Sequence, residues 1–405
     1  MFAFGLYLFF TFFAPQERHE WLAAIRPALS SAVLTAIIMY FSRASAIRDK
    51  QQVKAKLTIK TYLMAVLCIL MFITNTFSPL ELTVLPTGIV SLMKLAALYY
   101  LTTGIIRTEK DLKTVIKILF IFGSVIAVYS LVGYRIGWEK PVYRLVSPFG
   151  GMGSNSNGFA MLLLGLLPFA IMYINQQESP SRKAVYIVIA LSIVMCVIKT
   201  RSRMGFLGLI FQFSIFAWDN RKKAGALLLV VLIITVALFR AHENLWERVT
   251  TISTQSTDIS KYSSARQNKW RQAVVLIKRY PITGVGIDQF RMAVIQHDLG
   301  EFKHIVHNAF LEIGAEAGIV NMVLFVILIF SHIKNSLKNY MSFYRKNNVF
   351  LISATRAVLI AVVFFAFCLI FLSEQYSSML YILLGLAVGC DRIAANYRMK
   401  PSTSE

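Results

Sequence analysis

His307 is the residue of this chain best suited to accept a proton from a hydroxyl group. It lies in a short polar segment with His304 and Asn308, followed by a helix-like stretch that carries Glu312 and Glu316. A histidine side chain has a pKa of about 6.5, so it can act as a general base where a hydroxyl group reaches it. A purely structural histidine is the alternative, and sequence spacing alone does not decide between the two.

A short basic turn offers two arginines for binding an anion. Residues 199–205 read K-T-R-S-R-M-G between two apolar runs, with almost no loop on either side. The guanidinium group is a planar fork whose N–H donors match pairs of phosphate oxygens, so Arg201 and Arg203 suit a diphosphate at a membrane surface. Anchoring to anionic headgroups is the alternative, but it is more usual on the cytoplasmic face.

A second candidate segment combines Arg266 with Trp270. Residues 265–280 are expected to form an amphipathic helix that stops at Pro281. Arg266 would then stand at the start of this helix, where the helix dipole disfavours a cation, and this mismatch suggests a functional role. The alternatives are a solvated charge for Arg266, and a core or interfacial aromatic instead of a stacking platform for Trp270.

Two further positions are unusual for their surroundings. Lys94 lies near the middle of an apolar run, where an ionised side chain is costly and usually faces a polar cavity or a partner. Asn157 ends a loop rich in glycine, serine and asparagine, residues 147–158, whose backbone N–H groups could bind an anion. An ordinary loop explains that stretch as well.

No metal site is expected. His297, His304 and His307 lie near Asp298 and Glu301 in the sequence, but their spacing matches no standard ligand pattern. The four cysteines fall within or at the ends of apolar runs, so we expect them to pack as small apolar side chains. They are Cys68, Cys196, Cys368 and Cys390.

The composition places these residues in a membrane protein. Of the 405 residues, 57% are hydrophobic and only 15% are charged, and the mean hydropathy is +0.61. A soluble domain has about a quarter charged residues, so a soluble enzyme and a disordered chain are excluded. The net charge of +22 comes in short clusters between apolar runs, and this argues against a nucleic-acid-binding stripe.

The apolar runs predict an all-α polytopic membrane protein with about twelve transmembrane helices. A helix needs about 20 apolar residues to cross a hydrocarbon core of roughly 30 Å. The predicted spans are residues 2–14, 28–42, 61–78, 87–106, 115–133, 158–174, 184–198, 204–218, 224–239, 318–333, 350–373 and 376–390.

The basic residues predict how the chain is oriented. Lys and Arg concentrate in alternate connections, and such loops resist translocation, so we expect both termini in the cytoplasm. The long polar connection, residues 240–317, is then outside the cytoplasm, and connections of this length are usually functional. Three regions follow: a membrane region of about nine helices (1–239), a mostly helical external loop carrying part of the active site (240–317), and a three-helix membrane region with a short cytoplasmic tail (318–405).

Together these clusters resemble the superfamily of bacterial O-antigen ligases and polymerases. The order of the clusters, the number of spans and the long external loop before the last three helices all fit that family. The residues that carry the resemblance are Asn157 after the glycine-rich loop, Ser202-Arg203-x-Gly205, Arg266 with Trp270 and Pro281-x-x-Gly284-x-Gly286, and His307-Asn308 followed by Gly318.

The resemblance implies a membrane glycosyltransferase of the GT-C-like architecture in the bacterial inner membrane. Its donor would be a glycan linked to undecaprenyl diphosphate, and it would need neither a nucleotide sugar nor a metal or other cofactor. Arg203 and Arg266, with Arg201, would hold the donor diphosphate, and His307 would act as general base on the acceptor hydroxyl, which attacks with inversion. Supporting roles are expected for Asn308, Trp270, Lys94 and Asn157.

Several reactions fit this resemblance. In a ligase the acceptor is a sugar of the lipid A core, and in a polymerase it is the end sugar of another lipid-linked repeat unit. The compact size and the His307-Asn308 context favour the ligase. A protein O-glycosyltransferase and a transporter of lipid-linked glycans are further alternatives, although the chain has no internal repeat of the kind that transporters show.

Overall fold

The computed structural model describes residues 1–17, 19–48, 58–79, 87–136, 144–149, 153–219, 256–299, 305–345 and 347–399. Within these ranges every regular element is a helix, which confirms the all-α prediction. The helices are α1 (Phe2–Phe12), η1 (Pro15–Glu17), α2 (Glu20–Ile25), α3 (Pro27–Arg48), α4 (Ile59–Thr76), α5 (Thr87–Ile105), α6 (Glu109–Ile136), α7 (Ser156–Gln176), α8 (Pro180–Lys199), α9 (Arg203–Asp219), α12 (Ser256–Arg279), α13 (Phe290–Gln296), α14 (Ala309–Ala317), α15 (Ile319–Arg345), α16 (Val349–Leu369) and α17 (Ser378–Met399).

Nine helices in the described part of the chain are long and apolar enough to cross a membrane. The first is Glu20–Ser42, which covers α2 and most of α3. The others are the helices α4 to α8 and α15 to α17. α1 is apolar but has only 11 residues, and at about 1.5 Å per residue it cannot cross a core of roughly 30 Å. The apolar part of α9, Arg203–Phe216, is also short, and the predicted run 224–239 lies outside the described residues. The prediction of a multi-pass membrane protein is thus confirmed. Nine of the twelve expected spans correspond to candidate membrane helices among the described residues.

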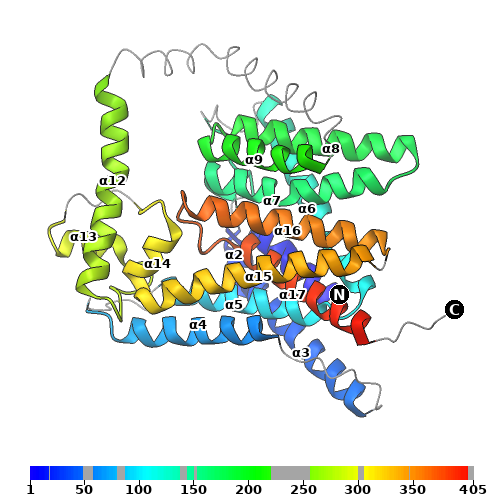
Figure 1. Cartoon of the computed structure of the whole chain (residues 1–405), viewed down its shortest axis with the longest axis horizontal. Helices are drawn as coiled ribbons and strands as arrows, with labels where there is room; N and C mark the ends of the chain where they lie inside the picture. The colour runs from blue at the N-terminus through cyan, green and yellow to red at the C-terminus, as the bar shows by residue number, and fades with distance from the viewer. Residues whose placement is uncertain are drawn as a thin grey trace.

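The long helices lie side by side in a bundle, and α12, α13 and α14 gather at one end of it (Figure 1). α7 is a central helix, because 83% of its spanning segment is buried, compared with 22% in the neighbouring α8. α7 packs against α8 and α16, while α17 packs against α5, α15 and α16. α14 packs against α12 and α15. The end of the bundle that carries α12–α14 is called the α14 end below.

Asparagine caps set the first residue of three helices. The side-chain oxygens of Asn155, Asn308 and Asn348 accept hydrogen bonds from backbone N–H groups three residues later, at 2.7, 3.0 and 2.9 Å. Each bond satisfies a donor that has no partner within the helix. α7 and α14 therefore begin at defined positions next to Asn157 and His307.

Glycines bring the segment after α12 against the end of α14. A Cβ atom at Gly284 would lie 2.3 Å from the backbone of Glu316, and one at Gly318 would lie 2.2 Å from the carbonyl oxygen of Ile282. Both glycines also have positive φ angles, 66° and 88°, which side-chain-bearing residues rarely adopt. The glycines of the sequence motif are thus required for close packing beside α14.

The same segment is bonded to the end of α4. The hydroxyl group of Ser78 donates to the carbonyl oxygen of Val285 (2.6 Å), and the N–H group of Ile287 donates to the side-chain oxygen of Asn75 (2.8 Å). Val285 in turn donates its N–H group to the carbonyl oxygen of Ala315 in α14 (2.9 Å). The α12–α14 unit is therefore fixed to the membrane helices.

The helix expected over residues 265–280 is longer than predicted. α12 spans Ser256–Arg279, so Arg266 lies in its interior and the prediction of a helix start at Arg266 is wrong. Polar residues precede Arg266, and without an apolar period they gave no sign that the helix had already begun. The end before Pro281 is as expected, and α14 leads through Gly318 directly into α15.

Candidate active site

His307 lies immediately before α14 with its backbone in the left-handed region. Its φ angle is 58°, a conformation that residues other than glycine rarely adopt. Asn308, the next residue, caps α14 through its bond to the N–H group of Leu311. Such backbone strain persists only where neighbouring groups hold it, and it is concentrated at functional sites.

Ser373 holds the backbone of His307 in place. The N–H group of His307 donates to the Ser373 hydroxyl oxygen at 2.9 Å. The Ser373 hydroxyl group in turn donates to the carboxyl group of Glu312 in α14. Three residues from two distant parts of the chain thus form one hydrogen-bonded chain, and we call it the Glu312–Ser373–His307 chain.

The two glutamates of α14 are buried behind His307. Burial raises the pKa of Glu312, and burial together with the nearby Glu312 carboxyl group raises the pKa of Glu316 well above its ordinary value. Glu316 accepts hydrogen bonds from the N–H group of Phe290 (3.4 Å) and the hydroxyl group of Tyr376 (3.3 Å). Both glutamates lie in the interior of this unit, and their bonds join α14 to Phe290, Ser373 and Tyr376.

The basic turn lies between α8 and α9, and the start of α7 holds it. The oxygen of the Asn157 side chain accepts hydrogen bonds from the Ser202 hydroxyl group (2.9 Å) and from the Arg144 guanidinium group (3.1 Å). Arg144 also donates to the carbonyl oxygen of Thr200 at 3.1 Å. Asn157 therefore acts as a cross-link that positions the turn.

Within this turn the two candidate arginines differ. Arg201 is half-buried and has a positive φ angle of 50°. Arg203 is the first residue of α9, and its side chain is exposed. The Ser202 hydroxyl oxygen accepts from the N–H group of Gly205 (3.1 Å) and so helps to cap α9. The start of α9 presents the arginines and the positive end of a helix dipole together, a combination suited to binding an anion.

The loop between α16 and α17, residues 370–377, connects the start of α7, which holds the turn, to the His307 segment. Ser373 contacts His307 and Glu312, whereas the next residue, Glu374, forms a side-chain hydrogen bond with Asn155 at the start of α7. Burial raises the pKa of Glu374 to about 7. The α7–α9 side and the α14 side therefore meet at this loop, at one end of the bundle.

Ser373, Glu374 and Arg144 were not identified from the sequence. Ser373 and Glu374 fall at the junction of two apolar runs, where a serine and a glutamate look like an ordinary connection. The hydrogen-bond partners of Ser373 are 61 and 66 residues away in the sequence. A local sequence pattern does not predict contacts between residues so far apart. A polar cluster inside a very short interhelical connection was the one available signal.

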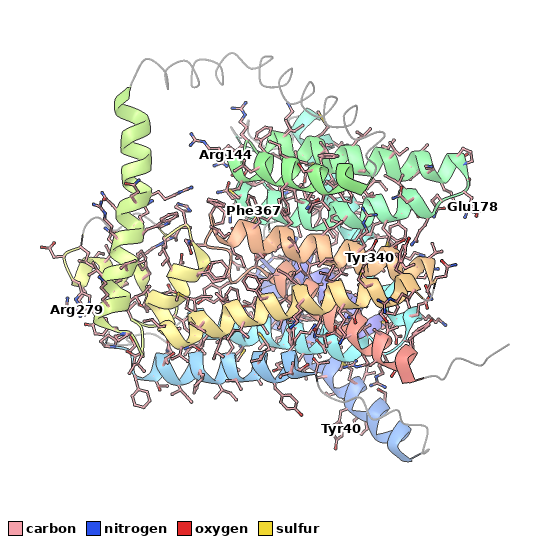
Figure 2. The ribbon with its side chains drawn as sticks, viewed as in Figure 1. Tyr40, Arg144, Glu178, Arg279, Tyr340 and Phe367 are labelled. Carbon is pink, nitrogen blue, oxygen red and sulfur yellow. The ribbon has the colours of Figure 1, made fainter. Side chains whose placement is uncertain are left out.

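Arg266 and Trp270 lie on α12 and have different environments. The side chain of Arg266 is exposed, whereas Trp270 is half-buried and packs against the small apolar cluster of Ala273, Leu276 and Val285. This burial favours the interpretation of Trp270 as a core aromatic. Arg279 at the far end of α12 and Arg144 beside the turn both lie toward the α14 end, and Glu178 lies at the opposite end (Figure 2).

Lys94 lies on α5, in the half of the helix that begins at the α14 end. Its side chain is exposed on the surface of the bundle, and the Tyr7 hydroxyl group donates to its carbonyl oxygen at 3.5 Å. Gly88, at the start of the same helix, lies against Ile287 of the segment after α12. The structure thus places Lys94 on the exposed surface of the bundle within about two turns of the site end, and its role in the site stays a prediction.

The arrangement brings together groups for one type of reaction. A histidine held by a hydrogen-bonded chain can accept a proton, and an exposed arginine at a helix start can bind a negatively charged leaving group. Both lie at the same end of a membrane-embedded bundle, where the reacting group of a lipid-linked molecule would be found.

A comparison with protein families gives a match over part of the chain. Residues 187–326 match the family model described as O-antigen ligase. This family covers both O-antigen ligases and polymerases, so the match confirms the resemblance expected from the sequence. The matched residues include the basic turn, Arg266, Trp270, His307 and Asn308. No curated protein matches the chain.

Proposed function

We propose that this chain, whose residues 187–326 match the O-antigen ligase family model, is an O-antigen ligase. The match to this family and the multi-pass bundle support membrane glycosyl transfer of the ligase or polymerase type. The finer proposal is that it transfers a glycan from undecaprenyl diphosphate to a sugar hydroxyl group of the lipid A core.

One observation carries the proposal. The Glu312–Ser373–His307 chain and the basic turn lie at the same end of the bundle, and the α16–α17 loop contacts both this chain and the start of α7, which holds the turn. A general base and a diphosphate-binding group must act on opposite sides of one anomeric carbon, so they must belong to one site. This adjacency supports glycosyl transfer better than transport, which needs a path across the bundle.

The proposed reaction is a direct displacement. His307 accepts the proton of the acceptor hydroxyl group while the hydroxyl oxygen attacks the anomeric carbon of the donor sugar. The bond between that carbon and the diphosphate oxygen breaks, and the anomeric configuration is inverted. Arg203, with Arg201 and Arg266, stabilises the negative charge that develops on the leaving undecaprenyl diphosphate. Neither a metal nor another cofactor takes part in this proposal.

The remaining residues have supporting roles in this proposal. Asn157 holds the basic turn and Asn308 caps the helix behind His307. Trp270 packs the α12–α14 unit, and Lys94 lines the donor site. The site faces the periplasm and both termini face the cytoplasm, as the distribution of basic loops predicts. Residues 240–317 are then the periplasmic part of the chain.

The acceptor distinguishes the ligase from the polymerase. The experiment uses purified protein in liposomes with a lipid-diphosphate-linked glycan, with and without lipid A core, in the presence of a chelator. We expect glycan to appear on lipid A core and no longer lipid-linked chains to form without it. Longer lipid-linked chains in the absence of the core would show that the protein is a polymerase.

A further inference from the structure

Glu374 is a half-buried carboxyl group at the junction of the two sides of the site, and the reaction above gives it no role. It lies between Ser373, which contacts His307, and Gln375, which is buried. The loop that carries it lies between the membrane spans of α16 and α17.

Contacts on two sides fix the position of Glu374. Its carboxyl group hydrogen bonds to the side chain of Asn155, the residue that caps α7. Its Oε1 atom lies 3.4 Å from the position that a Cβ atom would take at Gly158, so it lies directly against the first turn of α7. The N–H group of Ser377 donates to its carbonyl oxygen (3.1 Å), which closes the loop around it. The carboxyl group therefore has a defined position.

The groups that face Glu374 leave it without a cation among the described residues. They are Asn155 before α7, Glu312 on α14 and Cys368 at the end of α16. Burial, followed by the nearby Glu312, raises the pKa of Glu374 to about 7, while the bond to Asn155 lowers it. A carboxyl group of this kind changes its charge near neutral pH.

We infer that Glu374 forms a subsite for the acceptor sugar, in which its ionised carboxylate accepts hydrogen bonds from sugar hydroxyl groups beside His307. This inference rests on the proposed function. An ionised carboxylate only accepts hydrogen bonds, and a sugar offers several hydroxyl donors. The donor diphosphate is not a suitable occupant, because two negative groups repel each other.

Glu374 directly follows Ser373 in the loop, and for this reason we expect the acceptor sugar to be its ligand. Ser373 binds the backbone of His307, so a sugar that places one hydroxyl group at His307 has its neighbouring hydroxyl groups near the next residue of the loop. A charged hydrogen bond from such a group orients the sugar for attack. Orientation of this kind lowers the barrier because the reacting atoms are held close together.

The test measures acceptor binding without turnover. In the His307→Ala protein, which lacks the proposed general base, binding of lipid A core and of the lipid-linked repeat unit is measured separately at pH 6 and pH 8. Because a carboxyl group with a pKa of about 7 is largely neutral at pH 6 and ionised at pH 8, we expect about tenfold tighter binding at pH 8. The added substitution Glu374→Gln should abolish this difference and weaken binding about tenfold at pH 8.

Two further variants control the result. Glu178→Gln removes an exposed carboxyl group at the opposite end of the bundle (Figure 2) and should leave both affinities unchanged. Glu374→Asp keeps the charge on a shorter side chain, so it should bind more weakly but retain the pH dependence. It also provides the test if Glu374→Gln does not fold.

The outcomes separate this inference from the proposed function. Equal binding at pH 6 and pH 8, or tighter binding at pH 6, would overturn the subsite of Glu374. The same pH dependence with the lipid-linked repeat unit instead of lipid A core would keep the subsite and assign it to a polymerase. Absence of glycan transfer by the unsubstituted protein to either acceptor would overturn the proposed function, whatever the binding results show.

Discussion

The two ends of the helix bundle both contain buried polar residues, but their arrangements differ. At the α14 end, Ser373 binds the backbone N–H group of His307, and Arg203 is exposed at the start of α9. At the opposite end, Lys60 of α4 forms an ion pair with Asp391 of α17 (2.5 Å), and Asn339 of α15 donates to the same carboxylate (2.6 Å).

The difference shows how this chain separates stability from function. At the opposite end the charged groups satisfy one another and join three spans, which is the usual requirement for charges inside a membrane. At the α14 end the polar contacts hold the backbone and the turns, and an arginine side chain is left accessible for a ligand. We therefore expect substitutions at the α14 end to change kinetics and those at the opposite end to change stability.

The largest kinetic effect is expected for His307→Ala. Loss of a general base typically lowers the rate by about 10²–10⁴-fold, while the donor still binds because the basic turn is intact. The measurement is kcat for glycan transfer, together with binding of undecaprenyl diphosphate. His19→Ala, which removes an exposed histidine, is the control and should be silent. Unchanged kcat in His307→Ala would show that another group is the base.

Arg203→Ala should have the next largest effect. Loss of a charge-assisted contact to the diphosphate costs about 1.5–3 kcal/mol, so the Kd for undecaprenyl diphosphate should rise by roughly 10- to 150-fold. Arg203→Lys should recover part of this loss, because lysine retains the positive charge but lacks the planar guanidinium group that donates two hydrogen bonds to a phosphate. The control Arg182→Ala removes an exposed arginine at the start of α8. If both alanine variants bound the donor equally well, the assigned diphosphate contact would be wrong.

Ser373→Ala should reduce kcat by about tenfold. The substitution leaves the His307 N–H group and the Glu312 carboxyl group without their shared partner, at a cost of about 1–3 kcal/mol. Ser373→Thr retains the hydroxyl group and should recover most of the rate. Ser192→Ala, which removes a hydroxyl group that bonds only the backbone of α8, is the matched control. A thermal midpoint lowered without any change in kcat would mean that Ser373 does not position His307.

Lys60→Ala tests the opposite end and should affect catalysis least. It leaves Asp391 without its ion-pair partner, so the free energy of unfolding should fall by about 3–5 kcal/mol. Joint replacement of Lys60 and Asp391 by leucine should recover much of that loss, because the uncompensated charge is gone. Transfer by the remaining folded protein should keep its normal kcat. If Lys60→Ala lowered kcat without lowering the free energy of unfolding, the assignment of stability to this end of the bundle and of function to the α14 end would be wrong.

The sequence predicts the membrane helices well and the contacts of the site less well. Long apolar runs identify spans such as α7 and α16 because their length is set by the thickness of the bilayer. The basic turn was predicted because two arginines with almost no adjoining loop are unusual. Glu374 and Arg144 were missed because their roles arise from contacts with residues far along the chain. The start of α12 was misplaced because its first residues are polar and have no apolar period.

The central claim is that the basic turn and the His307 segment form one site for a lipid-linked donor. A photoreactive analogue of undecaprenyl diphosphate, cross-linked to the purified protein in liposomes and mapped by mass spectrometry, tests it directly. We predict labelled peptides from residues 199–205 and from residues 305–312, and loss of both labels with excess unlabelled undecaprenyl diphosphate. Labelling confined to the opposite end of the bundle, around Lys60 and Asp391, would contradict the claim.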